Sequence, residues 1–463
     1  MQRMGGIGTP PVQAQAVLDD LAAELEKRQF NDDTLAPKLA NLKAIARNPR
    51  DAPGVYCSAG VNLLAKAAFG SRSDEHRRSS LEAARTIANA LLLQENLRQT
   101  FADAPYIEGL LDFYDQTDPD HEFVGARILF LLTYGSQIDF VSLIQSKGLI
   151  SRVEAHLKRH AVSMRDDDLA DDAVTQMALV ETLKLLYNLA TKCPSETSMF
   201  SLTFEPLVDV LCKTDIPSRP LDPPIGQLLN ALAIIEWPVQ KLSNHSEGDQ
   251  ELLTAQLIML LDRSTATLKP ALLETMLVPL ITVLRKVNAA SISTIDKQLR
   301  KKLLPRDEER DKPLGKSDTL ASRLLRLQTS AGLTILPEAI SGLLFDLSDH
   351  DAEQFVHNIG YGHAAGYLMT HNIPLPQDLR TTTRSAAAGG EKIQINPVTG
   401  QRLDAEKSAD LPPMTKDEKE REAQKMFVLF ERLKTNGVMN MENPLRTAQQ
   451  SGRFEELSDS ESD

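Results

Sequence analysis

The stretch HNIGYGHAAG, residues 357–366, has the glycine spacing that most suggests chemistry, with Gly360, Gly362 and Gly366 inside seven positions. Glycine-rich loops can hold a phosphate when a strand precedes them and a helix follows. The preceding segment, EAISGLLFDLSDHDAEQFV, has a helical pattern instead, and the chain lacks the GxxxxGK(S/T) spacing of a P-loop. The sequence therefore predicts that Gly360 and Gly362 end one helix and turn tightly into the next, and that no nucleotide binds there.

Two histidines, His156 and His160, lie four residues apart on an expected helix, a spacing that could hold a metal ion. No third ligand stands beside them, so we expect a solvated helix face. The acidic run RDDDLADD, residues 165–172, lacks the glycine and the terminal glutamate of a calcium loop, which indicates an exposed loop. No GxSxG or HExxH motif occurs. The sequence thus predicts no metal, no cofactor and no catalytic residues, and therefore a protein that is not an enzyme.

Two other features suit binding. Lys43 and Arg47, in NLKAIARNP, are expected on one helix face at i and i+4, where like charges repel slightly. They could meet an anionic partner such as a carboxylate, or form an ordinary solvated surface. The second feature is an amphipathic helix near the C-terminus, which could fold back on the rest of the chain or lay its apolar face on a partner.

Composition favours a helical protein of a reducing compartment. The 463 residues are 42% hydrophobic, with Leu and Ala dominant and only 5% aromatic, which favours helices over a β-sandwich. A net charge of −13 disfavours a general nucleic-acid binder. Cys57, Cys193 and Cys212 have no CxxC spacing, which argues against a disulfide framework or a structural zinc. With no signal-peptide pattern and no apolar run long enough to span a bilayer, we expect a cytoplasmic protein.

The elements that must position these residues are helices. From about residue 12 to 375, apolar residues recur with a helical period between short Pro, Gly or Asp interruptions. The clearest stripes are Leu81, Ala84, Ala88 and Leu91; Leu179, Leu183, Leu186 and Ala190; Leu273, Leu277, Leu280, Leu284 and Val287; and Ile340, Leu343, Leu344 and Leu347. Pro279 is expected to start a second helix or to kink one. No alternating strand pattern is found.

A loose internal repeat shows in three of these helices. Each carries an asparagine near its end, namely Asn89, Asn188 and Asn230, and the last two lie 42 residues apart. That period is typical of armadillo or HEAT repeats, in which stacked helix pairs leave a long concave face. The sequence predicts an all-α armadillo/HEAT-type solenoid over residues 1–378, with an irregular helical domain as the alternative.

The C-terminal part changes in composition. Residues 379–413 are small and polar around an INPVTG turn, which predicts a flexible linker. Residues 414–437 predict an amphipathic helix, opened by the capping box Thr415 and Glu418. Its apolar stripe is Ala423, Met426, Phe427, Phe430 and Leu433. Residues 438–463 end in the acidic EELSDSESD, which predicts a disordered tail.

These motifs together resemble the synembryn family, also called the resistance-to-inhibitors-of-cholinesterase 8 family. The resemblance rests on GYGHAAGYL, INPVTGQ and MTKDEKEREAQKMFVLFERL, in that order, and it runs from about residue 40 to 437. ARILFLLT, ETLKLLYNLA, LVPLITVLRKV and LRKKLLPRDEER also look like its helices. The short linker and the stretch before INPVTG, which is poor in acidic residues, resemble fungal members.

The resemblance implies an armadillo/HEAT-type solenoid that binds the α subunits of heterotrimeric G proteins (Gα). It implies a folding chaperone and a non-receptor guanine-nucleotide exchange factor that binds no nucleotide itself. Carried to this sequence, Lys43 and Arg47 would pair with the C-terminal carboxylate of Gα. Asn89 and, less directly, Asn188 would contact the captured C-terminal helix. The switch region of Gα would meet Met426, Phe427 and Phe430.

The sequence leaves two further expectations. Family members from animals carry acidic phosphorylation sites before INPVTG, whereas here the better candidates are Ser458, Ser460 and Ser462 in the tail; an unmodified acidic tail is the alternative. The protein is expected to act as a monomer that binds no nucleic acid and reaches the inner face of the plasma membrane only through Gα. The competing function is a passive armadillo-type scaffold or adaptor, which would bind peptides without promoting exchange.

Overall fold

The computed structural model describes residues 9–27, 31–70, 77–164, 172–238, 247–290, 293–330, 332–374, 382–384, 393–396, 398–406 and Arg421. Contacts within the chain divide it into two units, Met1–Ala405 and Glu406–Asp463, and the first contains nearly all described residues. Its described secondary structure is helical apart from a short hairpin, which confirms the predicted all-α class.

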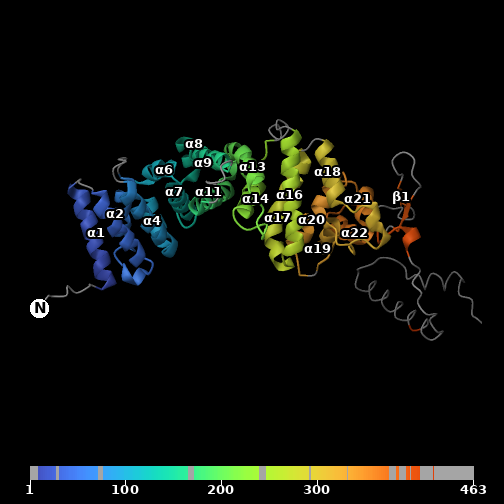
Figure 1. The fold of residues 1–463 in the computed structure, drawn as a ribbon, viewed down its shortest axis with the longest axis horizontal. Helices are drawn as coiled ribbons and strands as arrows, with labels where there is room; N and C mark the ends of the chain where they lie inside the picture. The colour runs from blue at the N-terminus through green and yellow to red at the C-terminus, as the bar shows by residue number, and fades with distance from the viewer. Residues whose placement is uncertain are drawn as a thin grey trace, which may run out of the picture. The chain divides into compact units, whose positions relative to one another are not determined.

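One layer of helices runs through the first unit, and each of its helices packs on the next in sequence order (Figure 1). This first layer consists of α2 (Asp32–Ile45), α4 (Arg77–Leu93), α7 (Pro119–Leu132), α11 (Ala173–Lys192), α14 (Ile225–Ile234), α17 (Pro270–Ala290) and α20 (Ile335–Asp346). Each helix of this layer thus packs mainly on the layer helices that come just before and just after it along the chain.

A second layer covers one side of the first. It includes α1 (Pro10–Lys27), α3 (Ser58–Phe69), α9 (Leu149–Ser163), α13 (Phe204–Lys213), α16 (Glu247–Thr267) and α19 (Leu320–Gln328). In order, these pack on α2, α4, α11, α14, α17 and α20. Each of these six first-layer helices therefore has a side that faces away from its second-layer partner.

The remaining elements lie between these helices in sequence or follow α20. The helices among them are α5 (Asn96–Ala102), α6 (Ile107–Tyr114), α8 (Phe140–Lys147), α12 (Thr197–Phe200), α18 (Ser293–Leu303), α21 (Ala352–Ile359) and α22 (Tyr361–Thr370). Single 3-10 turns span Pro49–Asp51, Pro194–Glu196, Ser201–Thr203, Asp307–Asp311 and Leu403–Ala405. None of the helices in the described ranges is long and apolar enough to cross a membrane.

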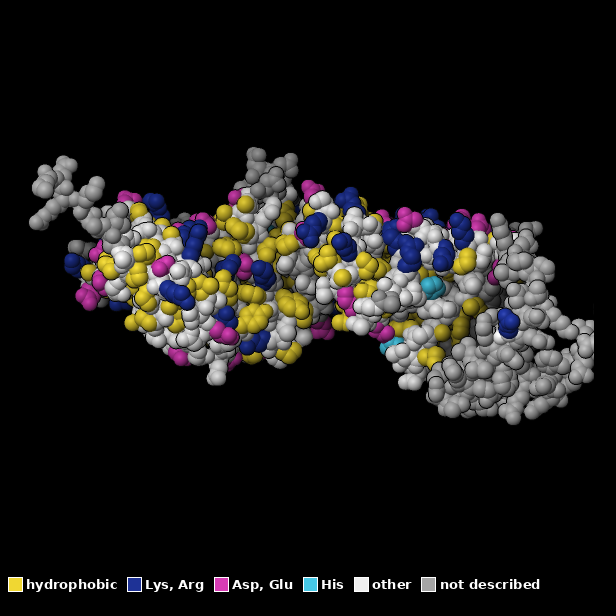
Figure 2. Space-filling view, turned by 90° about the horizontal axis from the view of Figure 1, so that it is seen from below, with side chains coloured by type: hydrophobic (Ala, Val, Ile, Leu, Met, Phe, Trp, Pro, Cys, Tyr) yellow, Lys and Arg dark blue, Asp and Glu magenta, His cyan; other side chains and the backbone are white. Residues whose placement is uncertain are grey.

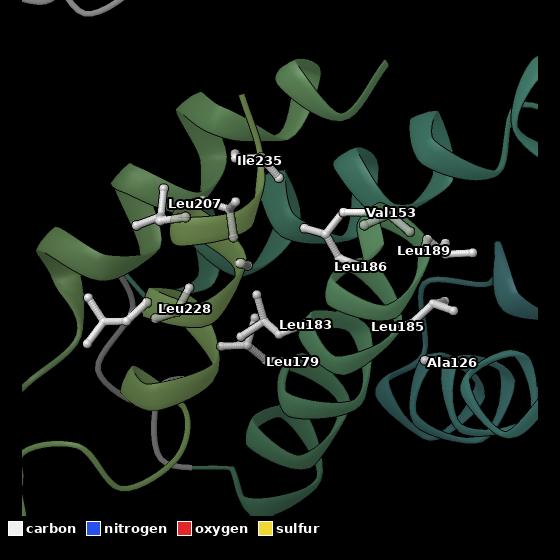
Figure 3. Close-up of a cluster of buried hydrophobic side chains, with 14 of the residues drawn as sticks. Ala126, Val153, Leu179, Leu183, Leu185, Leu186, Leu189, Leu207, Leu228 and Ile235 are labelled. Atoms are coloured by element: carbon white, nitrogen blue, oxygen red, sulfur yellow. The ribbon is translucent and has the colours of Figure 1, made fainter. Parts of the chain in front are cut away.

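The four apolar stripes predicted between residues 81 and 347 form the core. All of their residues are buried except Leu81, which packs half-buried against the cluster. Helix α11 shows how the two layers share this core, because its Leu183 and Leu186 lie among Val153 of α9, Leu207 of α13 and Leu228 of α14 (Figure 3). Burying a leucine side chain contributes roughly 1.5–3 kcal/mol.

Local signals explain where α11 begins and ends. The Asp172 side chain accepts a hydrogen bond from the Thr175 backbone N–H at 2.9 Å, as an N-cap residue does. The helix ends at Lys192, two residues before Pro194, whose ring would prevent its continuation. In α17, Pro279 lies inside one continuous helix, so of the two alternatives for this proline the second helix starting there is excluded.

Two expectations about backbone differ from the structure. Strands β1 (Thr382–Arg384) and β2 (Ile393–Ile395) pair antiparallel, although no strand was expected, because three residues are too few to show an alternating pattern. Gly360 ends α21 with φ of +80°, as predicted for a turn. Gly362, however, lies in the first turn of α22 and not in the connection.

Candidate functional site

The structure places three of the predicted binding residues on the first layer. Lys43 lies on α2, Asn89 on α4 and Asn188 on α11, and all three side chains are partly exposed. Arg47 does not share the helix face of Lys43, because α2 ends at Ile45 and Arg47 lies exposed in the turn that follows. The first layer therefore gathers side chains that are distant in sequence, without Arg47.

Lys43 is already paired within the protein. Its Nζ lies 2.6 Å from Glu82 of α4, and the same carboxylate accepts a hydrogen bond from Arg85 at 2.6 Å. Arg85 also pairs with Asp120 of α7. Burial would raise the pKa of Glu82, but hydrogen bonds from Lys43 and Arg85 outweigh burial and hold that pKa below its usual range. The network is neutral and ties α2, α4 and α7 together.

A second charged group joins α7 to α11. Arg127 Nη1 lies 3.4 Å from Glu181 and Lys184 Nζ lies 3.0 Å from the same carboxylate. The Arg127 guanidinium stands 5.6 Å from the centre of the Phe123 ring, and Lys184 Nζ stands 6.0 Å from that of Phe130. Aromatic rings at such distances attract cations and help to fix their positions.

Asn188 belongs to a polar contact between the same two helices. Its Nδ2 donates to Thr133 Oγ1 at 2.8 Å, and its Oδ1 accepts a long hydrogen bond, 3.4 Å, from the Tyr134 hydroxyl. One turn further along α11, Lys192 Nζ donates to the Thr133 carbonyl at 3.3 Å. Sequence analysis identified Asn188, whereas its partners have no signal of their own in the sequence.

Apolar side chains on these elements remain exposed, and sequence analysis missed them. Leu92 and Leu93 at the end of α4 and Tyr134 after α7 are nearly half exposed, and Tyr187 on α11 is 39% exposed. Figure 2 shows hydrophobic side chains reaching the surface over the N-terminal helices, with Lys and Arg among them. Exposed apolar residues rimmed by polar ones are typical of binding surfaces. We call this surface of α4, α7 and α11 the α4–α11 face.

The glycine-rich stretch HNIGYGHAAG, residues 357–366, belongs to a junction built around Arg310. The Arg310 guanidinium, 1% exposed, donates to the carbonyls of Gly400, His357 and Asn358 at 3.0, 3.2 and 3.1 Å. The Arg402 N–H donates back to the Arg310 carbonyl at 2.7 Å. The motifs LRKKLLPRDEER, GYGHAAGYL and INPVTGQ, far apart in sequence, thus meet in space.

The glycines permit this close approach. The Gly362 N–H donates to the Val398 carbonyl at 3.1 Å, and a Cβ at Gly362 would lie 3.2 Å from that oxygen. A Cβ at Gly360 would lie 3.2 Å from both the Gly400 nitrogen and the Val398 carbonyl, in a backbone conformation that favours glycine. The glycines therefore allow two backbone segments to touch, a structural role that needs no nucleotide.

His156 and His160 correct the expected solvated face, because both are buried on α9. Their imidazoles surround the carboxylate of Glu122 from α7, with His156 Nδ1 at 3.1 Å and His160 Nε2 at 2.9 Å. Thr182 of α11 donates to the same carboxylate at 2.8 Å. The i, i+4 spacing that suggested a ligand pair instead reflects two histidines that share one buried acid.

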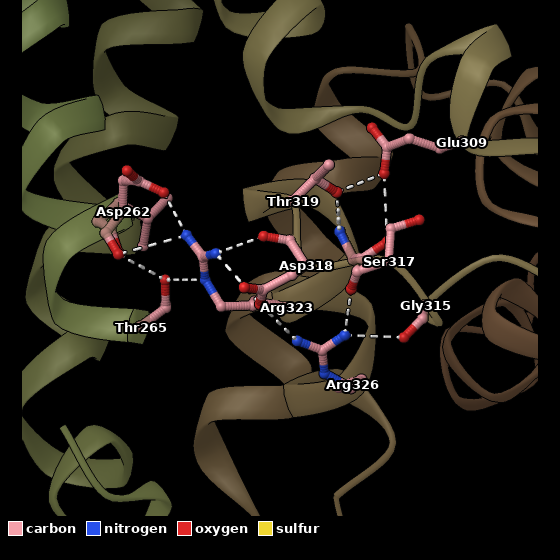
Figure 4. Close-up of polar contacts among 11 residues, drawn as sticks. Asp262, Thr265, Glu309, Gly315, Ser317, Asp318, Thr319, Arg323 and Arg326 are labelled. Atoms are coloured by element: carbon pink, nitrogen blue, oxygen red, sulfur yellow. Dashed lines mark hydrogen bonds and ion pairs between the residues drawn. The ribbon is translucent and has the colours of Figure 1, made fainter. Parts of the chain in front are cut away.

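A groove of about 880 Å³ lies between α16, α18 and α19. Its apolar floor is Ala255, Ile258, Met259, Ala266, Leu320 and Ala321. Arg323 on its rim is held by Asp262, by Thr265 Oγ1 at 3.1 Å and by the Asp318 carbonyl at 2.8 Å (Figure 4). The lining carries charged side chains of both signs, among them Lys302, Arg306, Glu308 and Glu309.

A Gly-Lys-Ser tripeptide, Gly315 to Ser317, directly precedes Asp318 of the groove lining and matches the end of a P-loop pattern. A P-loop needs glycine five positions before Gly315, and Arg310 stands there. The carbonyls of Gly315 and Ser317 accept hydrogen bonds from Arg326 at 2.9 and 2.5 Å. The turn thus directs carbonyls toward a guanidinium, which is unlike a cradle of N–H groups for phosphate.

Neither a metal-ligand cluster nor a buried thiolate is found among the residues that the structure describes. No group of three or more His, Cys, Asp or Glu among them could hold a metal ion. Burial raises the pKa of Cys193, and it raises that of Cys212 to about 11, so both stay as thiols near neutral pH. The predicted contact residues Met426, Phe427 and Phe430, and Ser458, Ser460 and Ser462, lie outside the described residues.

Comparison with known proteins agrees with the resemblance in the sequence. The family described as "guanine nucleotide exchange factor synembryn" (Ric8) matches residues 38–453. A synembryn-like chaperone of Schizosaccharomyces pombe is 24% identical over 417 residues, which cover 81% of this chain and 76% of that protein. The chaperone Ric-8A of Xenopus laevis is 30% identical over 177 residues, which cover 36% of this chain and 32% of that protein.

The chain thus matches about a third of the length of this Ric-8A relative. Among solved structures, an engineered protein is similar with a TM-score of 0.37 and 16% identity, covering 60% of this chain and 97% of that one. At that score the likeness supports no conclusion about fold or function.

Proposed function

The chain belongs to the synembryn family, and on that basis we propose that it binds Gα subunits, chaperones their folding and promotes GDP release. Members of the family are exchange factors and chaperones and not enzymes, which confirms the prediction of a non-enzyme. The α4–α11 face supports the proposal most directly, since it combines exposed Leu92, Leu93, Tyr134 and Tyr187 with polar Asn188. An amphipathic helix, such as the C-terminal helix of Gα, suits such a face.

Exchange would follow from a difference in affinity. A nanomolar affinity for GDP corresponds to about 12 kcal/mol, which the exchange factor cannot oppose by mere binding. It must bind empty Gα more tightly than GDP-bound Gα, and by linkage GTP binding then weakens the complex. Chaperone activity is the same preference expressed before nucleotide enters, because a surface that holds empty Gα also protects its incomplete core.

The repeat type is part of the proposal. Two layers with nearest-neighbour packing support an armadillo/HEAT-type solenoid. The starts of α2, α4 and α7, and those of α14 and α17, are spaced near the period of about 40–47 residues of such repeats, whereas the steps from α7 to α11, from α11 to α14 and from α17 to α20 are longer. We retain residues 1–378 as the solenoid, 379–413 as a linker whose INPVTG turn is anchored by Arg310, 414–437 as a helix and 438–463 as a tail.

The C-terminal helix is the proposed second contact. Its stripe of Met426, Phe427 and Phe430 would cover the switch region of Gα, which a passive peptide-binding scaffold would not need. Lys43, Arg47 and Asn89 remain proposed contacts of the C-terminal helix of Gα. We infer a monomer that works in the cytoplasm and reaches the membrane through Gα, without binding nucleotide or nucleic acid itself.

Phosphorylation of Ser458, Ser460 and Ser462 is proposed separately. These serines stand among acidic residues in SDSESD, at the end of the chain. Mass spectrometry of the protein purified from its own cells should find phosphate on at least one of them. Three unmodified serines would remove this part of the proposal and leave the rest intact.

A GDP-release assay on purified Gα tests the proposed function. The full chain should accelerate release of labelled GDP, and a chain lacking residues 414–463 should lose most of that effect while still binding a Gα C-terminal peptide. The variant Lys43→Glu/Arg47→Glu should bind the peptide more weakly. A full chain that binds the peptide but leaves GDP release unchanged would favour the passive scaffold.

A further inference from the structure

The linker predicted over residues 379–413 is interrupted by the INPVTG turn, which is folded onto the first unit. Two backbone hydrogen bonds close the turn, from the Asn396 N–H to the Gln401 carbonyl at 2.7 Å and from the Gly400 N–H to the Asn396 carbonyl at 2.8 Å. Ile395, the last residue of β2, is 4% exposed, and Gln401 is 8% exposed. This part of the linker is therefore buried structure and not free chain.

The 3-10 turn that contains Arg310 holds one side of the INPVTG turn. The Arg310 guanidinium donates to the Gly400 carbonyl at 3.0 Å, and the Arg310 carbonyl accepts the Arg402 N–H at 2.7 Å. The Gln401 side chain donates to the Asp311 carbonyl at 3.0 Å. Because Arg310 is 1% exposed, its hydrogen bonds form in a region of low local dielectric, where they are stronger than in water.

Two backbone contacts hold the other side of the turn. The Leu314 N–H donates to the Thr399 carbonyl at 3.1 Å, and the Gly362 N–H of α22 donates to the Val398 carbonyl at 3.1 Å. We call these contacts, together with those around Arg310, the clamp. Segments that are distant in sequence thus fix the INPVTG turn at one place on the first unit.

The clamp leaves only a short tether before the predicted C-terminal helix. The Gln401 side chain also donates to the Ala405 carbonyl at 3.2 Å, and the first unit ends at Ala405. Between Ala405 and the helix predicted from residue 414 stand residues 406–413, which are eight of the 35 residues of the linker. A flexible chain of 35 residues has an average end-to-end distance of about 30–35 Å, and one of eight residues about 14–17 Å.

A shorter tether raises the effective concentration of the segment that it carries. Effective concentration falls roughly as the −3/2 power of tether length, provided that the tether can span the distance between the two binding sites. Shortening the tether from 35 to eight residues therefore raises the effective concentration roughly ninefold. This gain needs no additional contact with the partner.

We propose that the clamp strengthens the second contact by shortening the tether, so that exchange activity depends on the length of residues 406–413 and not on that of the whole linker. This inference rests on the proposed function, since it takes residues 414–437 as a second contact with Gα. It makes Arg310 a positioning residue that acts through the tether. Residues 385–392 join β1 to β2 ahead of the clamp, so their number should have no influence on exchange.

The test inserts the same Gly/Ser segment, about 20 residues long, at two places in the full chain. The downstream insert follows Glu406, beyond the clamp, and the upstream insert separates Gly389 from Gly390, ahead of it. The readout is the rate of GDP release from Gα per unit concentration of the chain, well below saturation. The downstream insert should lower this rate roughly sixfold, since the tether grows from eight to about 28 residues. The upstream insert should leave the rate unchanged.

Opening the clamp should remove the difference between the two inserts. In Gly400→Ala, the added Cβ would clash with the Leu314 side chain, at a φ of +67° that favours glycine. The whole linker then serves as tether, so the rate should fall by up to roughly ninefold, and each insert should lower it further by only about twofold. Faster hydrogen exchange at the Leu314 amide would verify the opening. Gly366→Ala is the control and should retain the wild-type rate and the wild-type difference between inserts.

Peptide binding separates this inference from the proposed function. A labelled peptide with the C-terminal helix sequence of a Gα subunit makes only the first contact, so every variant should bind it with wild-type affinity by fluorescence anisotropy. Circular dichroism melts verify that each variant folds. Equal rates for the upstream and downstream inserts, with the clamp intact, would overturn this inference while leaving the proposed function. A full chain that does not accelerate GDP release would instead overturn the proposed function itself.

Discussion

The carboxylate of Glu122 shows how a single residue can set the acid stability of the protein. It is buried between His156, His160 and Thr182, with Arg159 3.6 Å away. Burial would raise the pKa of Glu122, but hydrogen bonds from the two histidines outweigh burial and hold that pKa well below its usual range. A carboxyl group with a lowered pKa stabilises the fold above its unfolded pKa of about 4.3 and loses that contribution as the pH falls further.

Glu122→Gln should therefore destabilise the protein at neutral pH by roughly 2–3 kcal/mol, because the buried histidines and Arg159 lose their charged acceptor. Thermal melts followed by circular dichroism at pH 7 measure the effect. The loss of stability between about pH 5 and pH 3 should also be smaller in the variant, since the linked protonation is gone.

The matched control is Glu154→Gln on the same helix as the histidines, where Glu154 pairs with Lys158 at the surface. Exposed pairs of this kind contribute up to about 1 kcal/mol. Equal melting temperatures for Glu122→Gln and wild type would show that the buried acid is not a stabilising group.

Gly360 gives a second test at this scale. With φ of +80° and Val398 and Gly400 at 3.2 Å from an added Cβ, Gly360→Ala should cost about 1–3 kcal/mol. Gly366→Ala on α22 is the control, because nothing lies within 4 Å of its added Cβ and alanine favours a helix by roughly 0.5–1 kcal/mol. Urea unfolding should give a higher free energy of unfolding for Gly366→Ala than for wild type, and a lower one for Gly360→Ala. The reverse order would contradict the close approach of Gly360 to Val398 and Gly400.

Residue types alone singled out Lys43 by its charge on an expected helix face, whereas Asn89 and Asn188 became site candidates only through the family resemblance. All three lie on the first layer, and their part in binding stays a prediction. The partners Glu82 and Thr133 could not be identified, since they depend on which helices pack together. His156 and His160 were expected on a solvated face because their i, i+4 spacing does not reveal the acid on α7.

At the scale of elements, Arg310 holds three chain segments with one side chain. It bonds backbone carbonyls before α22 and in the INPVTG turn, while its own carbonyl accepts the Arg402 N–H. Only a guanidinium offers enough donors in a fixed plane to reach several carbonyls at once. The junction thereby fixes the INPVTG turn to the end of the helical layers within the first unit.

Arg310→Lys should loosen this junction while keeping the charge. We expect a loss of about 2–4 kcal/mol in the free energy of unfolding, because two of the three carbonyls would lack their donor. Hydrogen exchange should quicken at the Gly362 and Leu314 amides, which donate to Val398 and Thr399. Arg306→Lys, at an exposed site, is the control and should change neither quantity. Unchanged exchange in Arg310→Lys would mean that the turn is held without the guanidinium.

Helices were predictable where the apolar period runs over several turns. The stripes of α11, α17 and α20 correspond to buried residues, because the apolar face of an amphipathic helix packs against the core. The details that failed depend on tertiary contact. Pro279 is accommodated inside α17, and β1 and β2 form by pairing three residues each, which no local pattern signals.

At the scale of the whole first unit, the same helices both pack the core and present polar side chains to solvent. Its first layer packs on the second through Leu183 and Leu186, while the other side of α11 carries Lys184, Asn188 and Lys192 toward solvent. Local, nearest-neighbour packing gives such stacks a large surface for their length. We expect this surface to bind the nucleotide-free state of a GTPase more tightly than the GDP-bound state, without acting on a covalent bond.

Isothermal titration calorimetry of the full chain against nucleotide-free and GDP-bound Gα tests this claim most directly. We expect the nucleotide-free form to bind more tightly by roughly 5- to 150-fold, the usual range of coupling between two ligands. Equal dissociation constants for the two forms would contradict it, because a protein without that preference cannot promote the release of GDP.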